Sequence, residues 1–165
     1  MTKQAKINDV AQFITGGKAI VTITNTENKK HVTLRFNRSN DGRTIFVSVL
    51  RGTDNMDDDS YTFIGNLWPS LAFTHGKRSK LGSDSVAVRT GRWIAKVARG
   101  EIDQSPVMEI HHGGRCCFCR RSLTQTESIK RGYGPSCADK RGLPYGAVTK
   151  RARETQTSNK EQEVA

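Results

Sequence analysis

The sequence lacks any long apolar run. No stretch approaches the roughly 20 apolar residues that span a membrane. The first ten residues, MTKQAKINDV, also lack the apolar centre of a secretory signal peptide. We therefore expect an intracellular, cytoplasmic protein. Its 165 residues can form one core of ordinary size with a small appended module, but not two large domains.

Motifs of catalysis are lacking as well. The chain has no G-x-S-x-G, no H-E-x-x-H, no phosphate-binding glycine loop and no internal repeat. We therefore do not expect an enzyme. The acidic stretch DNMDDD at residues 54–59 does not match calcium-loop spacing, so we interpret it as a solvated loop. Two alternatives are docking of a basic host protein and, more remotely, a nuclease that uses Asp57 and Asp58 with a divalent metal.

Acidic residues are few compared with basic ones. Lys and Arg number 27 against 16 Asp and Glu, which gives a net charge of +11. The excess is uneven, because residues 111–151 hold nine Lys or Arg and only two acids. Such a surplus favours a polyanionic partner.

Short β-branched runs follow Gly17 and predict strands at residues 19–24, 31–36, 44–50 and 61–65. The turn-rich segments between them favour an antiparallel meander. The third run is apolar on both faces, so we expect a helix against its second face. We expect residues 84–99 to form that helix, with Val86, Thr90, Trp93 and Val97 on the side facing the sheet and Ile94 near the edge of that side. Residues 1–11 read as a flexible N-terminus, although Asp9 can start a short helical turn before Phe13.

Cysteine is confined to one place, because all four cysteines lie within residues 116–137. Cys116 and Cys119 form a C-x2-C pair, Cys137 follows, and His112 precedes. In a reducing compartment this set predicts a tetrahedral zinc site rather than a disulfide. Four protein ligands leave no position for water, so we expect a structural metal. Cys117 is the alternative to His112 as fourth ligand.

The residues around these cysteines predict two short helices. Thr124 and Glu127 form a capping-box pattern, so a helix should cover residues 125–131 and end at Gly132. Pro135 suits the start of a second helix, which places Cys137 in its first turn. Residues 108–112 read as a strand on which His112 points the same way as Met108 and Ile110.

The segment from His112 to Cys137 resembles a family of small, largely uncharacterised bacteriophage proteins. Their C-terminal segment reads approximately H-x-G-R-C-x-x-C-G-R-x-L-T-x-x-x-S-I-x-x-G-x-G-P-x-C. The resemblance extends more weakly over residues 12–142 and implies a phage-encoded protein. It departs from the pattern at Arg120, which replaces a glycine, and at Cys117, an added thiol.

Two cationic surfaces are candidates for nucleic-acid contacts. One surrounds the cysteines, where arginines could pair with phosphates and Tyr133 or Phe118 could stack on a base, unless these rings only pack around the metal. The other is a stripe on the predicted helix, which could also be an ordinary solvated face. The first consists of Arg115, Arg120, Arg121, Lys130, Arg131, Tyr133, Lys140 and Arg141, and the second of Arg89, Arg92, Lys96 and Arg99.

We therefore predict an α+β fold, in which an N-terminal antiparallel β-sheet with one covering helix is followed by a small zinc-bound module with two short helices. The expected divisions are 1–11, a β-rich domain at 12–106, the zinc-binding module at 107–143, and a disordered basic and polar tail at 144–165. The predicted function is nucleic-acid binding with zinc as cofactor. The alternative is a phage-encoded protein that binds and inhibits or redirects a host protein.

Overall fold

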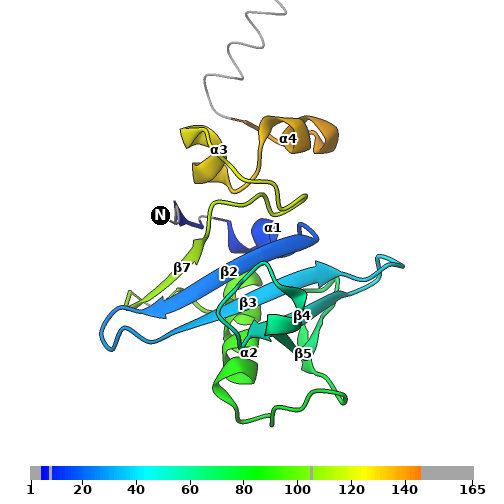
Figure 1. Ribbon diagram of the computed structural model, residues 1–165, viewed down its shortest axis with the longest axis vertical. Coiled ribbons are helices and arrows are strands. Elements are labelled where there is room, and N and C mark those ends of the chain that lie inside the picture. The colour runs from blue at the N-terminus through cyan, green and yellow to red at the C-terminus, as the bar shows by residue number, and fades with distance from the viewer. Residues whose placement is uncertain (1–4, 8, 105, 146–165) are drawn as a thin grey trace, which may run out of the picture.

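The computed structural model of the protein describes residues 5–7, 9–104 and 106–145 (Figure 1). These residues form an α+β fold with one seven-stranded antiparallel sheet in the order β1-β7-β2-β3-β4-β5-β6. The strands are β1 Ala5–Lys6, β2 Lys18–Asn25, β3 His31–Arg38, β4 Ile45–Leu50, β5 Tyr61–Leu67, β6 Phe73–His75 and β7 Met108–His112. The helices are α1 Val10–Ile14, α2 Val86–Ala98, α3 Thr126–Arg131, α4 Pro135–Arg141 and the short 3-10 turn η1 Asp58–Ser60. No helix of the described residues is long and apolar enough to cross a membrane.

The predicted meander is present as the neighbouring strands β2 to β5, each antiparallel to the next. Alternate residues of β2 and β3 point to one face, where Val21, Leu34 and Phe36 are almost fully buried. The helices α1 and α2 contact each other and pack on this face. The core of the protein therefore lies between the sheet and these two helices.

The described N-terminal residues, 5–7 and 9–11, are structured, which corrects the expectation of a flexible segment for these residues. Strand β1 pairs with β7 through Ala5 opposite His112, and Ile7 and Val10 are buried in the core. Asp9 caps α1, since its side chain accepts a hydrogen bond from the backbone N–H of Gln12 at 3.0 Å. The short helical turn that the sequence suggested before Phe13 is therefore present.

Helix α2 presents a different side to the sheet from the one predicted. The buried positions are Ala87, Val88, Gly91, Ile94 and Ala95, while Val86 is 58% exposed. Small residues allow close approach, because a methyl group added at Gly91 would lie 3.0 Å from the Phe73 ring. The helix and the strands therefore pack through small side chains.

Among the described residues, no α-helix covers the second face of β4, contrary to the prediction. Phe46 on this face is 44% exposed and meets the ring of Phe63 edge-on at 6.2 Å. The acidic loop folds toward this face, where Asp58 accepts a hydrogen bond from Arg35 at 2.7 Å. Arg35 also stacks on the Tyr61 ring at 4.1 Å.

The boundary predicted at residue 107 does not separate two domains. Strand β7, placed in the predicted module, lies between β1 and β2 within the sheet. The segment after β7 continues from the sheet and carries α3 and α4 at one end of the molecule (Figure 1). Tyr145 belongs to this unit, because it is buried and its hydroxyl lies 2.5 Å from Ser128 Oγ. The rest of the predicted tail, residues 146–165, lies outside the described residues.

Candidate metal centre and cationic surface

The loop after β7 makes a tight turn that carries two cysteines. Arg115 and Ser122 form an isolated antiparallel bridge, and the N–H of Cys116 donates to the carbonyl of Arg121 at 2.9 Å. The turn closes where the N–H of Arg120 donates to the carbonyl of Cys116 at 2.8 Å. Cys116 and Cys119 are thereby placed on the same side of the loop.

Arg120 adopts a left-handed backbone conformation, with φ at 65°. Glycine occupies this position in the pattern that the segment resembles, and glycine accepts such a conformation without strain. The Arg120 side chain offsets the strain, because its guanidinium donates to the carbonyl of Lys18 at 3.2 Å and to the Asn37 side chain. Arg120 therefore fastens the cysteine loop to the start of β2 and the end of β3.

Helix α4 supplies the third cysteine. Pro135 occupies its first turn, as predicted, and Cys137 follows two residues later. Helix α3 ends at Gly132 with φ at 83°, also as predicted, but Gln125 rather than Thr124 is its N-cap, and that residue makes no side-chain capping bond. The turn between the two helices brings Cys137 over the loop.

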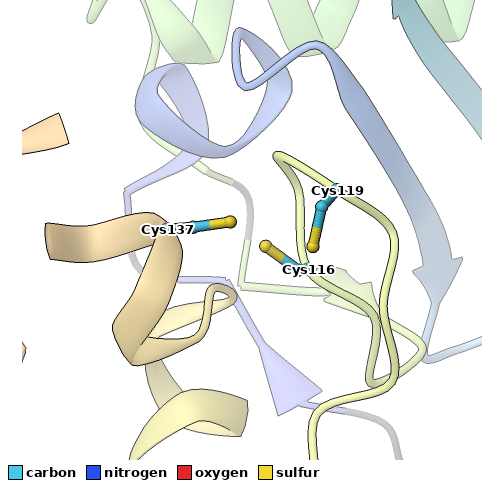
Figure 2. Close-up of side chains that lie close together, drawn as sticks. All are labelled: Cys116, Cys119 and Cys137. Atoms are coloured by element: carbon cyan, nitrogen blue, oxygen red, sulfur yellow. The ribbon is translucent and has the colours of Figure 1, made fainter. Parts of the chain in front are cut away.

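The sulfur atoms of Cys116, Cys119 and Cys137 all lie within 4.8 Å of one another. Figure 2 shows the three side chains pointing toward one another, two from the loop and one from α4. A cluster of three thiols at this spacing fits a borderline-soft metal ion, since thiolates repel one another unless a cation lies between them. The structure thus brings together three of the four predicted ligands.

Backbone groups stabilise the thiolate form of Cys116. Burial would raise the pKa of this thiol, but the N–H groups of Phe118, Gly134 and Cys119 face its sulfur and lower the pKa below its usual value. The bond from Phe118 spans 3.4 Å. Loops that hold metal-bound thiolates need such donors, because the donors offset the negative charge of the sulfur.

His112 does not join the cluster. Its side chain points inward with Ile110, as alternation predicted, but its ring is 2% exposed and stacks on Phe13 at 5.2 Å. Nδ1 accepts from the N–H of Gly114 at 3.0 Å, and Nε2 lies 2.7 Å from the carbonyl of Ile129. Both ring nitrogens are therefore engaged, so the assignment of His112 as fourth ligand is corrected to a role in the core.

Cys117 is not part of the cluster either. It is fully buried, and burial raises the pKa of its thiol far above the usual value. Its sulfur faces the turn between α1 and β2, where a methyl group added at Gly16 would lie 2.9 Å from it. The backbone carbonyl of Cys117 accepts from the N–H of Lys18 at 2.9 Å. This residue ties the loop to the start of β2.

The two aromatic residues considered as base-stacking platforms pack internally. Tyr133 is 4% exposed and donates its hydroxyl to the carbonyl of Pro144 at 2.6 Å, so its predicted contact with nucleic acid is corrected to a packing role. Phe118 lies 5.8 Å from the Tyr133 ring and is covered on another side by Arg141 at 4.1 Å. The interpretation that these rings pack around the metal agrees with this arrangement.

Among the predicted cations around the cysteines, three are occupied by internal contacts. Arg115 donates to the carbonyl of Arg120 at 3.3 Å, Arg120 is anchored to the sheet, and Arg131 pairs with Glu127 at 2.5 Å. The others are exposed and make no ion pair with a described residue. They are Arg121, Lys130, Lys140 and Arg141.

The cationic stripe on α2 is shorter than predicted. Arg99 folds back, donating to the carbonyl of Leu71 at 2.7 Å and pairing with Glu101 at 2.6 Å. Arg89, Arg92 and Lys96 are exposed. Helix α2 lies toward the other end of the molecule from α3 and α4 (Figure 1), so the two cationic surfaces are separate.

Two anchoring contacts have no counterpart in the sequence interpretation. Asn37 and the carbonyl of Lys18 hold Arg120, and Tyr145 reaches Ser128 and the Gln125 side chain. The first had a signal in the sequence, since a long donor side chain stands where the related pattern has glycine. The signal for Tyr145 was weaker, because it is only a single aromatic residue at the start of a polar segment.

The model of one protein family, described as a family of unknown function (DUF6011), matches residues 110–142. The matched segment begins within β7, ends just after α4 and contains all three converging cysteines. No curated protein and no solved structure matches the chain. The segment that resembles a known family is thus the one that could bind a metal ion.

Proposed function

We propose that the protein binds zinc at Cys116, Cys119 and Cys137 and binds nucleic acid through exposed cations on the same segment. The observation that supports nucleic-acid binding is the set of unpaired cations near the cluster. Arg121 and Lys130 are exposed, as is Lys140, and none has an acidic partner among the described residues. Cations that no acid neutralises gain free energy when they displace counterions from phosphates.

The arginines of this segment divide into two groups. Arg115, Arg120 and Arg131 hold the loop and α3 in place through bonds to protein atoms. The exposed cations make no such bonds, so neutralising them would leave the fold intact. This division allows binding to be tested separately from folding.

Zinc has a structural role in this proposal, because it joins the loop after β7 to the first turn of α4. Residues 113–145 contribute few buried apolar side chains to the common core. Cross-linking by metal would supply folding free energy that this limited burial does not. We expect one zinc per chain by elemental mass spectrometry. Cys119→Ser or Cys137→Ser should lose it and, by hydrogen exchange, lose protection in α3 and α4 while the sheet retains protection.

Nucleic-acid binding is tested by the salt dependence of affinity for a mixed-sequence oligonucleotide, measured as a single strand and as a duplex. The variant neutralises Arg121, Lys130 and Lys140 to Gln. Each lost phosphate contact should reduce the slope of log affinity against log salt by about 0.7 to 0.9, so the triple variant should lose about 2 to 3.

The matched control neutralises the same number of charges on the other surface, at Arg89, Arg92 and Lys96. Its slope should stay close to that of the unmodified protein if α2 makes no contact. Equal losses of slope in both variants would indicate that binding depends only on the net charge of the protein. A slope near zero in the unmodified protein would refute nucleic-acid binding. In that last case a partner retained from nuclease-treated host lysate would favour the interaction-protein alternative. The bacteriophage origin is part of this proposal and rests on the sequence resemblance.

A further inference from the structure

All nitrogen and sulfur side-chain donors suited to zinc lie within the described residues. The chain has four cysteines and four histidines, and residues 146–165 contain neither type. Each candidate for a fourth nitrogen or sulfur ligand can therefore be located. Besides the three clustered cysteines, the candidates are Cys117, His31, His75, His111 and His112.

None of these five side chains has a donor atom beside the cluster. His111 points to the opposite face of β7 from His112, 3.5 Å from Glu109. His75 bonds to the carbonyl of Leu81 at 2.8 Å, and His31 lies at the end of β3 opposite Thr24. A fourth nitrogen or sulfur donor from the chain must therefore be His112 or Cys117, and no carboxylate of the described residues joins the cluster.

Both remaining residues are fixed in the core. To reach the metal, His112 would have to break its bonds to Gly114 and Ile129 and leave its stack on Phe13. The Cys117 sulfur would have to leave its close contact with Gly16, in the turn after α1. The side chain would also have to turn about a backbone bonded on both sides, to Gly132 and to Lys18. Breaking buried hydrogen bonds without replacement costs about 1 to 3 kcal/mol for each group.

The cluster can be reached from one side. Cys116 is 1% exposed and Cys137 is 9% exposed, whereas Cys119 is exposed to solvent. A molecule from solution would therefore approach along the turn that holds Cys119. The cations Arg121 and Lys140 stand on the loop and helix that supply the cysteines. Their positive charge counteracts the repulsion between the clustered thiolates and a further anionic donor.

We propose that the metal takes its fourth ligand from solution and that this ligand is a thiolate. Three thiolates around a divalent ion make a soft site that prefers a further soft donor, and tetrahedral geometry leaves one position for it. Neighbouring cations offset the additional negative charge. The protein then carries an exchangeable thiol site on its surface. The inference rests on one part of the proposed function, the binding of a metal ion at the three cysteines, and does not require nucleic-acid binding.

The test uses the full-length chain loaded with Co²⁺, whose visible absorption reports the donor set. The probe is 2-mercaptoethanol, with imidazole at equal concentration as the neutral-donor control. We expect the thiol to shift the absorption bands saturably and imidazole to do so only at much higher concentration. Cys117→Ala and His112→Phe should show the same bands and the same thiol response as the unmodified protein.

Three results would overturn the inference. One is a spectrum that does not respond to thiol, and another is a change in the bands on substitution of Cys117 or His112 that shows the loss of a sulfur or nitrogen ligand. A response to imidazole as strong as to thiol would refute the thiolate preference. If His112→Phe fails to fold, His112→Gln keeps a donor and an acceptor in the same place. A chain that binds no metal at all would instead refute the proposed function.

Discussion

Replacing Gly132 with alanine tests the packing that joins the cysteine segment to the core. Gly132 ends α3 in a left-handed conformation, and an added methyl group would lie 2.6 Å from one carbon of the Phe13 ring and 2.7 Å from another. Phe13 is 1% exposed and stacks on His112, so moving its ring away from the added methyl group would disturb that stack. The substitution therefore combines backbone strain with overpacking.

The magnitude follows from these two contributions. A left-handed alanine costs about 1 to 2 kcal/mol, and forcing a methyl group into a packed core costs about 1 to 3 kcal/mol. We expect Gly132→Ala to lower the free energy of unfolding by about 2 to 5 kcal/mol, the sum of these ranges. Urea denaturation at fixed metal and salt concentration measures this, and the dependence of the free energy on urea should stay unchanged.

Gly142 provides a matched control, because it ends α4 in the same way. Its φ is 64°, and an added methyl group would meet no atom within 4 Å. Gly142→Ala should therefore cost only the backbone contribution of about 1 to 2 kcal/mol. Equal losses in the two variants would refute the proposed packing of Gly132 on Phe13.

Two further predictions concern packing. Ile94→Ala should lower the free energy of unfolding in urea by about 2 to 5 kcal/mol, because Ile94 is fully buried. Val86→Ala should change it by less than about 0.5 kcal/mol, because Val86 is exposed. A larger loss at Val86 would indicate that α2 packs on the sheet through the side predicted from the sequence. Tyr145→Phe should lower the free energy of unfolding by about 1 to 3 kcal/mol, because it removes the hydrogen bonds to Ser128 and Gln125. It should also reduce hydrogen-exchange protection in α3. Unchanged protection would show that Tyr145 does not hold this helix.

The strands of the meander were predictable from the sequence because their alternation and turn residues are local signals. Strand β1 was not, since two residues with no apolar pattern become a strand only through their partners in β7. The packing side of α2 was not predictable from helical spacing alone, because that spacing favours the side that carries the large residues Trp93 and Val97. The packing face is instead made largely of small residues such as Gly91 and Ala95.

The cysteine site was partly predictable for the same reason. The spacing of Cys116 and Cys119 sets a short loop, and Pro135 sets the helix start that positions Cys137, so these signals are local. The role of His112 was not decidable, since a metal ligand and a core histidine both require a buried ring on the same side of β7. The positions of the Gly114 N–H and the Ile129 carbonyl decide it, and these depend on the complete fold.

Because β7 lies between β1 and β2, the order in which the chain folds is constrained. During synthesis the meander can pair as soon as β5 is available, but β2 keeps an open edge until residues 108–112 have been made. An unpaired edge strand is a site of aggregation, and closing it requires contacts between residues more than 80 positions apart, which slows folding. The strand that leads into the cysteine segment therefore also closes the most vulnerable edge of the nascent sheet.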